Sequence, residues 1–172
     1  MIFIGVDPGI AHFGIAAYDG NRFAVHGGSL PAVEGTDLRF TKICNSTISF
    51  VQLLNTLWDR YQEIHIEIPV KRERGEKKGT GKDLIPVALI AGAIGAIFQT
   101  LGGHHVSVHF HQPQAWKGQT PKAIHHSRLD LPPSAKDWTE HEKDAAGLAL
   151  FGLRLYKAQE EAREAQRKAR TP

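Results

Sequence analysis

Continuous and alternating runs of apolar side chains divide the first part of the chain into three strands. The apolar run that begins at Ile2 ends on Asp7 and is followed at once by a Pro-Gly turn, which is typical of a buried strand. A second apolar run covers 12–18, and the Asp-Gly-Asn sequence after it predicts a hairpin into a third strand over 22–27. We therefore expect a three-stranded meander with Asp7 at the carboxyl end of its first strand, which is a central strand of the sheet.

The spacing of apolar residues then changes to that of a helix. Apolar residues recur at helical spacing over 37–61, and an aspartate at the start can cap the first turn. A fourth strand is predicted over 64–68, where three isoleucines alternate with a histidine and Glu67. Because strands on either side of a crossover helix are most simply parallel neighbours, Glu67 is expected at the same sheet edge as Asp7.

A second helix, predicted over 83–101, is apolar on every side and carries a stripe of alanines and glycines. In a domain of this size one side of such a helix can face the sheet and the other a partner subunit. The sequence therefore predicts a homodimer with two-fold symmetry through this helix, and the alternative is a fully internal helix. A fifth strand is predicted over 105–111, whose histidines share one face. Such a row is more typical of a partly exposed sheet face or edge than of a metal site.

The last predicted helix opens at Glu140 and carries a second acidic residue in line with its apolar face. His141 and Asp144 are three residues apart, so they are neighbours on one side of this helix. An acidic residue in register with a core stripe is out of place unless it points at a site. We expect one domain over 1–157, followed by a charged helical extension or tail over 158–172.

Composition narrows the class of protein. With 172 residues and 41% hydrophobic content, the chain has enough material for one domain with a real core. No signal peptide is recognisable, and the longest apolar stretch, 84–98, is shorter than the ~18 residues of a membrane span, so we expect a soluble, cytoplasmic protein. The single Cys44 excludes an internal disulfide and a multi-cysteine zinc site. The net charge of +3 is a mild bias toward polyanions.

A basic loop follows the strand that carries Glu67. Residues 71–82 include six basic and two acidic side chains, three glycines and no large apolar group. A solvated surface loop is the simpler interpretation of such a run. Because this loop directly follows a candidate catalytic strand, we favour a clamp for a phosphate backbone. With two lysines after the fifth strand, the candidate DNA contacts are Lys71, Arg72, Arg74, Lys77, Lys78, Lys82, Lys117 and Lys122.

Three motifs together resemble the RuvC-type Holliday junction resolvases of the ribonuclease H-like superfamily. They are Ile4-Gly5-Val6-Asp7-Pro8-Gly9 with Gly14, then Ile66-Glu67, then His141-x-x-Asp144-Ala145-Ala146. The first motif alone is shared with sugar-kinase and chaperone ATPases, whereas the three in this order are more specific. The resemblance covers roughly 1–155 and implies an α/β, ribonuclease H-like fold with a five-stranded mixed sheet flanked by helices.

The resemblance also implies an activity, a cofactor and a set of ligands. Relatives are metal-dependent endodeoxyribonucleases that resolve four-way DNA junctions by paired cuts. The implied ligands of two divalent ions, Mg²⁺ or Mn²⁺, are Asp7 as the bridging carboxylate, Glu67, His141 and Asp144. His141 stands where many relatives have aspartate and shifts the preference toward manganese. Glu140, one residue away, could compete for its role.

One departure and two rival functions stay open at this point. The family commonly has an aromatic wedge shortly after the second carboxylate, whereas Ile68, Pro69 and Val70 follow Glu67 here. An RNA-processing nuclease of the related YqgF type shares the Asp-Pro-Gly strand. A non-catalytic dimer that binds junctions is the second alternative. An actin-like phosphotransferase is disfavoured because we find no second domain to enclose a nucleotide.

Overall fold

Five strands form one mixed sheet, as the motifs predict. The structure is a computed structural model of the whole chain, and it describes residues 1–31, 35–57, 62–68, 81–102, 105–117, 126 and 128–170, with the side chains of 81–83 excepted. The strand order is β3-β2-β1-β4-β5. The strands are β1 (Ile2–Asp7), β2 (His12–Tyr18), β3 (Phe23–Ser29), β4 (Gln62–Glu67) and β5 (Val106–His111).

The register of the central strands brings two acidic residues to one edge. Strand β1 is antiparallel to β2, with Asp7 opposite Gly14. It is parallel to β4, with Val6 opposite Ile66. Since Asp7 and Glu67 each follow one of these paired residues, both lie at the carboxyl end of the parallel pair. This is the arrangement expected for strands joined by a crossover helix.

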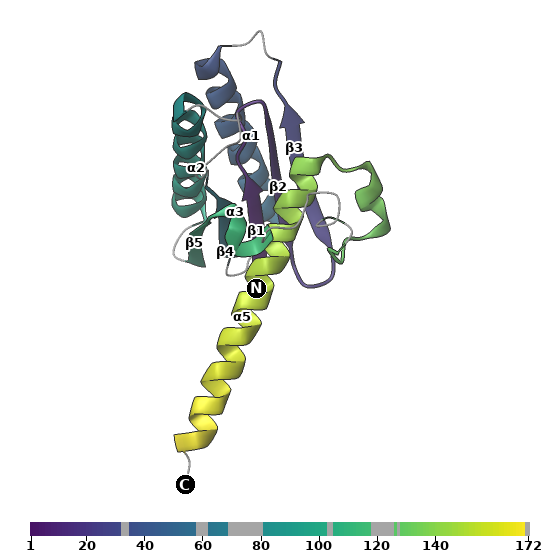
Figure 1. Cartoon of the computed structure of the whole chain (residues 1–172), viewed down its shortest axis with the longest axis vertical. Coiled ribbons are helices and arrows are strands. Elements are labelled where there is room, and N and C mark those ends of the chain that lie inside the picture. The colour runs from purple at the N-terminus through teal and green to yellow at the C-terminus, as the bar shows by residue number, and fades with distance from the viewer. Residues whose placement is uncertain are drawn as a thin grey trace.

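Helices cover both faces of the sheet (Figure 1). One face packs against α1 (Thr36–Leu57) and α2 (Gly81–Leu101), where Ile4 and Ile64 are fully buried. Alternate residues of the strands point to the other face, which α5 (Glu140–Arg170) covers. Because Asp7 and Glu67 are at these alternate positions, their side chains are on the α5 side.

Two glycines allow α5 to lie very close to the sheet. A Cβ atom on Gly5 would be 1.9 Å from the backbone oxygen of Ala145, and one on Gly14 would be 2.2 Å from that of His141. Only residues without a side chain fit at these two positions. The close contact fixes the first turns of α5 directly above the strand that ends in Asp7.

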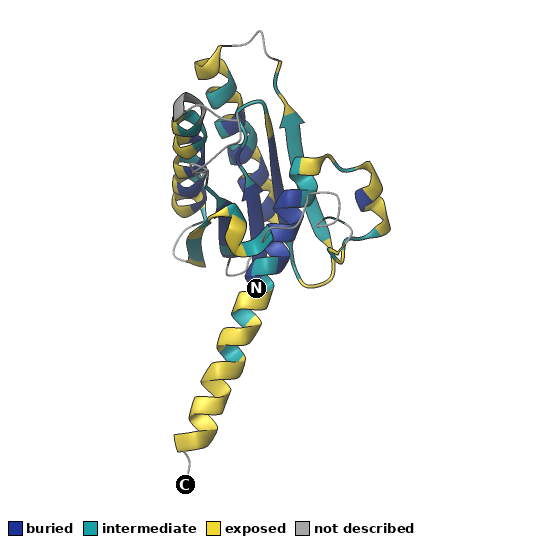
Figure 2. Ribbon diagram, in the orientation of Figure 1, coloured by how far each residue is buried: buried dark blue, intermediate teal, exposed yellow. Residues whose placement is uncertain are grey.

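Helix α5 continues well beyond the sheet. It is 31 residues long, and the part that was expected to be a helical extension or tail belongs to the same helix as far as Arg170. Beyond Tyr156, which packs against Phe3 at the beginning of β1, most of its residues are exposed (Figure 2). The extension therefore leaves the domain at the end opposite to Asp7.

Helix α2 is more apolar than a surface helix. Its segment Leu84–Leu101, 18 residues with a mean hydropathy of 2.1, is long and apolar enough to cross a membrane. The expectation that this stretch is too short was therefore wrong, because it continues past Phe98. Ile90, Ile94 and Phe98 are fully buried among the sheet residues, so one side of α2 belongs to the core of the domain, whereas only 28% of the segment is buried.

The predicted elements differ from the observed ones mainly at their ends. Strand β4 begins at Gln62, earlier than expected, and β3 extends to Ser29 because it pairs along the whole length of β2. Residues 58–61, expected in the first helix, lie outside the described part. The short helix α3 (Pro113–Lys117) and the 3₁₀ helix η2 (Pro133–Asp137) were not predicted.

The row of histidines on β5 lies at a sheet edge, as expected. His109 is exposed, and its Nε2 atom is 2.6 Å from a Glu63 carboxylate oxygen. The ring of His65 in β4 lies beside the rings of both His109 and His111, and His111 Nε2 is 2.9 Å from His65 Nδ1. Burial, and then the two neighbouring imidazoles, lower the pKa of His65 to about 3. His65 is therefore neutral and has a structural role under α5.

Candidate active site

The first contact of the site joins β1 to the start of α5. Asp7 Oδ2 is 2.6 Å from His141 Nδ1. A capping box formed by Thr139 and Glu142 begins the helix: the backbone N–H of Glu142 donates to Thr139 Oγ1, and that of Thr139 donates to Glu142 Oε2. The box fixes His141 in the first turn. This signal, Thr-x-x-Glu, is visible in the sequence and was missed.

The second contact joins β4 to the same helix through a lysine. Lys117 Nζ is 2.8 Å from Glu67 Oε2 and 2.8 Å from Asp144 Oδ2. Asp144 is completely buried, and the side chains of Glu67 and Lys117 are only 15% and 14% exposed. The ammonium group therefore lies between two carboxylates that come from distant parts of the chain.

The charges of this cluster shift the protonation of its members. Burial, and then the negative charge of Asp7, raise the pKa of Glu67 above its ordinary value. Burial acts to lower the pKa of Lys117, but the carboxylates of Glu67, Asp7 and Asp144 outweigh it and raise that pKa. Lys117 is thus protonated at neutral pH. The mutual influence of these groups shows that Asp7, Glu67 and Asp144 form one electrostatic unit.

Two further residues hold the carboxylates in place. His126 Nε2 is 2.6 Å from the second oxygen of Asp144. Trp116 Nε1 donates to Glu67 Oε2 at 3.1 Å. The indole ring occupies the space above Gly147, where a Cβ would be 2.8 Å from it. Sequence reasoning missed both roles. A tryptophan next to a lysine just after a strand end is only a weak signal of a site in the sequence. It is a signal because a half-buried indole N–H needs a hydrogen-bond acceptor.

A third histidine supports the ring of His141. His12 stacks on it with ring centres 5.4 Å apart and an angle of 14° between the rings. Its Nδ1 atom is 2.7 Å from Ser29 Oγ at the end of β3. The two contacts connect the outer strands of the meander to the site.

The residues predicted from the sequence fall into two groups. Asp7, Glu67, Asp144 and His141 are brought together, and His141 rather than the exposed Glu140 contacts Asp7. Lys117, predicted as a DNA contact, is in the carboxylate cluster. Six of the other predicted DNA contacts lie outside the described residues: Lys71, Arg72, Arg74, Lys77, Lys78 and Lys122. The seventh is Lys82, whose side chain lies outside the described part.

The donor set fits divalent cations. Three carboxylates and one imidazole are ligands that Mn²⁺ accepts, and the carboxylates suit Mg²⁺ equally. Within the described part of the chain, no group of three or more histidine, cysteine, aspartate or glutamate side chains is already arranged to hold a metal ion. The ammonium of Lys117, in contact with two of the carboxylates, marks a position where the protein stabilises a positive charge. Glu67 and Asp144 could bind a cation there only if Lys117 moved.

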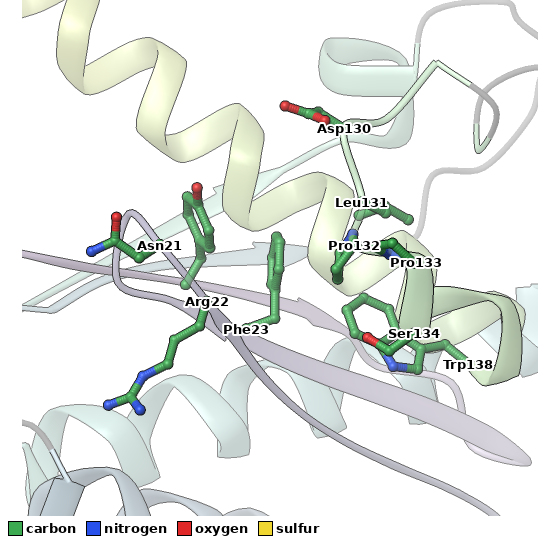
Figure 3. Close-up of a pocket in the computed structure, with 10 residues that line it drawn as sticks. Asn21, Arg22, Phe23, Asp130, Leu131, Pro132, Pro133, Ser134 and Trp138 are labelled. Atoms are coloured by element: carbon green, nitrogen blue, oxygen red, sulfur yellow. The ribbon is translucent and has the colours of Figure 1, made fainter.

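A pocket of about 460 Å³ at the β2–β3 hairpin is separate from this site (Figure 3). Tyr18, Phe23 and Trp138 line it together with the segment that precedes α5. Tyr18 pairs with Phe3, so the hairpin end of the pocket is at the end of β2 opposite to Gly14 and Asp7. We therefore do not assign this pocket to the carboxylate cluster.

If the site cleaves DNA as the resemblance implies, Trp116→Phe is expected to lower the cleavage rate about tenfold while the protein stays folded. The phenyl ring retains most of the packing at Gly147, whereas Glu67 loses a hydrogen bond to a charged acceptor, which is worth ~1.5–3 kcal/mol. Rates at saturating DNA measure the effect. The matched control is Tyr156→Phe, in a ring that packs against Phe3 at the end of β1 remote from Asp7, for which an unchanged rate is expected. Equal rates for both variants would show that the indole N–H has no positioning role.

Comparison with known proteins agrees with the fold. No protein-family model matches the chain, and no curated protein matches it by sequence. Among solved structures, RuvC of Thermus thermophilus superposes with a TM-score of 0.57 and 20% identity, covering 87% of this chain and 92% of that one. RuvC of T. thermophilus in complex with a Holliday junction substrate gives 0.58 and 18%, covering 87% and 90%. The ribonuclease H-like fold predicted from the three motifs is confirmed.

Proposed function

We propose that this protein is a structure-specific endonuclease that resolves four-way DNA junctions by metal-dependent hydrolysis of phosphodiesters. The observation that carries the proposal is the convergence of Asp7, Glu67 and Asp144 around one cation position. These carboxylates are on a scaffold similar to RuvC, one structure of which contains a Holliday junction substrate. We expect the protein to act in the cytoplasm, where such junctions form.

The chemistry follows from the donor set. We assign two Mg²⁺ or Mn²⁺ ions to Asp7, Glu67, His141 and Asp144. Bound in pairs, such ions lower the pKa of water and stabilise negative charge on a leaving oxygen. The protein's own part is to hold its ligands in position: the capping box fixes His141, and the contacts of Trp116 and His126 fix Glu67 and Asp144. Rigid support of this kind reduces the reorganisation needed for reaction.

Paired cuts in opposite strands need two sites, which a two-fold dimer supplies. The outer face of α2 offers a surface for such a dimer, because Ile85 and Leu89 are 65% and 62% exposed. Ala88, Gly92 and Ala96, also exposed, are on the same face at helical spacing. We assign the dimer interface to this face of α2. Its small residues allow a second helix to approach closely.

Leu89→Arg is expected to convert the dimer into monomers. The substitution places a charge in the middle of the assigned interface, and the side chain is exposed enough for the fold to tolerate it. Light scattering after gel filtration measures the mass. Leu155→Arg on α5, where the leucine is 36% exposed, is the matched control and should leave the mass unchanged. A wild-type protein that is monomeric at micromolar concentration contradicts the assignment.

A side-by-side cleavage assay tests the proposed function. The full chain is incubated with a four-way DNA junction, a linear duplex of the same sequence and a structured RNA, each with Mg²⁺ or Mn²⁺. We expect symmetric nicks in the junction only, with Mn²⁺ at least as effective as Mg²⁺ because of the histidine ligand. Cleavage of RNA alone would favour the YqgF-type nuclease. Binding of the junction without any metal-dependent nicking would favour a non-catalytic binding protein.

A further inference from the structure

We propose that Lys117 is a built-in counter-ion of the site: its ammonium group occupies the cation position between Glu67 and Asp144, and it must leave when a divalent cation binds. Lys117 would then set the cation concentration at which the site fills. This inference rests on the proposed function, because it requires that the carboxylates bind divalent cations.

The carboxylates of the cluster are costly to bury without a cation. Asp144 is fully buried, Glu67 is almost buried, and Asp7 is close enough for its charge to act on Glu67. Ionised carboxylates removed from water are strongly unfavourable unless a positive charge compensates them. Lys117 supplies that charge through two ion pairs of 2.8 Å each. The ammonium therefore stabilises the metal-free protein.

The ammonium group and a divalent cation need the same oxygen atoms. The two ion pairs use Glu67 Oε2 and Asp144 Oδ2. A Mg²⁺ ion bound by carboxylates is about 2.0–2.1 Å from its oxygens, and it cannot share the space with an ammonium at hydrogen-bond distance from the same two atoms. Binding is thus an exchange of one positive group for another. An ion at this position has to compete with Lys117.

The side chain of Lys117 can leave without disturbing the rest of the site. Its neighbour Trp116 anchors α3 through the bond to Glu67 and the packing at Gly147. The ammonium is also 4.6 Å from the centre of the Trp116 ring, a position in which the ring face attracts a cation. The anchoring residue, Trp116, and the residue that carries the mobile charge, Lys117, are thus adjacent in one short helix.

Lys117→Met tests the exchange on the metal-free full chain, with no DNA present. We expect the midpoint of Mn²⁺ binding, measured from free Mn²⁺ by electron paramagnetic resonance, to fall at least about tenfold, because the competing charge is gone. Without Mn²⁺ the melting temperature should fall by at least about 5 °C, since Glu67 and Asp144 lose the ammonium group that compensates their charge. Lys117→Arg, which keeps the charge, should restore both values to near wild type. Lys136→Met on η2, an exposed position, is the matched control and should change neither.

The outcomes separate this inference from the proposed function. Equal or weaker Mn²⁺ binding by Lys117→Met overturns the counter-ion role and leaves the metal site intact. Absence of Mn²⁺ binding by wild type and variant alike overturns the proposed metal site itself.

A labelling experiment on the wild type covers the case in which Lys117→Met does not fold. Acetylation by an N-hydroxysuccinimide ester, followed by mass spectrometry, should label Lys117 faster with saturating Mg²⁺ than without, because displacement exposes the amine. The labelling of Lys136 should stay constant. Slower or unchanged labelling of Lys117 with Mg²⁺ overturns the inference.

Discussion

Asp7→Asn is expected to slow junction cleavage at least about a thousandfold, while junction binding persists. The asparagine side chain has nearly the same shape, so the end of β1 and the packing of α5 should be unchanged. It lacks the negative charge that the proposed role of Asp7 as a metal ligand requires, and a preorganised charged group at a reacting centre contributes factors of this size. Cleavage rates and gel-shift affinities, measured on the same junction, separate the two effects.

The same substitution has an electrostatic consequence that can be measured without DNA. In the wild type, burial and then the charge of Asp7 raise the pKa of Glu67. Removal of that charge should lower this pKa toward its ordinary value, which carboxyl resonances in an NMR titration would report. Asp137→Asn, at an exposed position of η2, is the matched control and should leave cleavage unchanged. Residual cleavage within tenfold of wild type would mean that Asp7 is not a ligand.

Gly5→Ala is expected to destabilise the protein by about 3 kcal/mol or more and to abolish cleavage. The added methyl group would be 1.9 Å from the oxygen of Ala145 and 2.6 Å from the nitrogen of Ala149. Both are backbone atoms, so α5 as a whole must move away from β1, and overpacking of this kind costs 1–3 kcal/mol or more. A displaced α5 carries His141 and Asp144 away from Asp7. Denaturant unfolding and cleavage rates measure the two losses.

Gly35→Ala is the matched control for this effect. A methyl group at Gly35 meets no atom within 4 Å, so the change should leave stability within about 0.5 kcal/mol and cleavage unchanged. If Gly5→Ala is as stable as the control, then α5 is not held against β1 by close contact, and the placement of the last two ligands has another cause.

Much of the site could be predicted because its two strand carboxylates follow from local patterns. Asp7 and Glu67 each end an apolar strand, and the helix between the strands makes them parallel neighbours. Asp144 was recognised because it interrupts an apolar stripe, and it is completely buried. Each of these inferences needs only side-chain periodicity and the rules of strand connection.

The partners of these carboxylates could not be predicted in the same way. Lys117 was expected to contact DNA as one of two lysines after the fifth strand, yet it lies between Glu67 and Asp144. His126 and Trp116 likewise belong to segments whose local pattern carries no sign of the site. Their positions follow from the folding of α3 and the segment before η2 onto the carboxylate edge.

The sequence by itself determined the sheet, its order along the chain and the acidic residues at its edge, because periodicity and connection rules act over short stretches of chain. Only the tertiary structure decided how the buried negative charge is neutralised. The neutralisation depends on which donors reach the cluster once α5 packs against Gly5 and Gly14. It cannot be read from short stretches of chain, because the free energy of a buried charge depends on all of its neighbours at once.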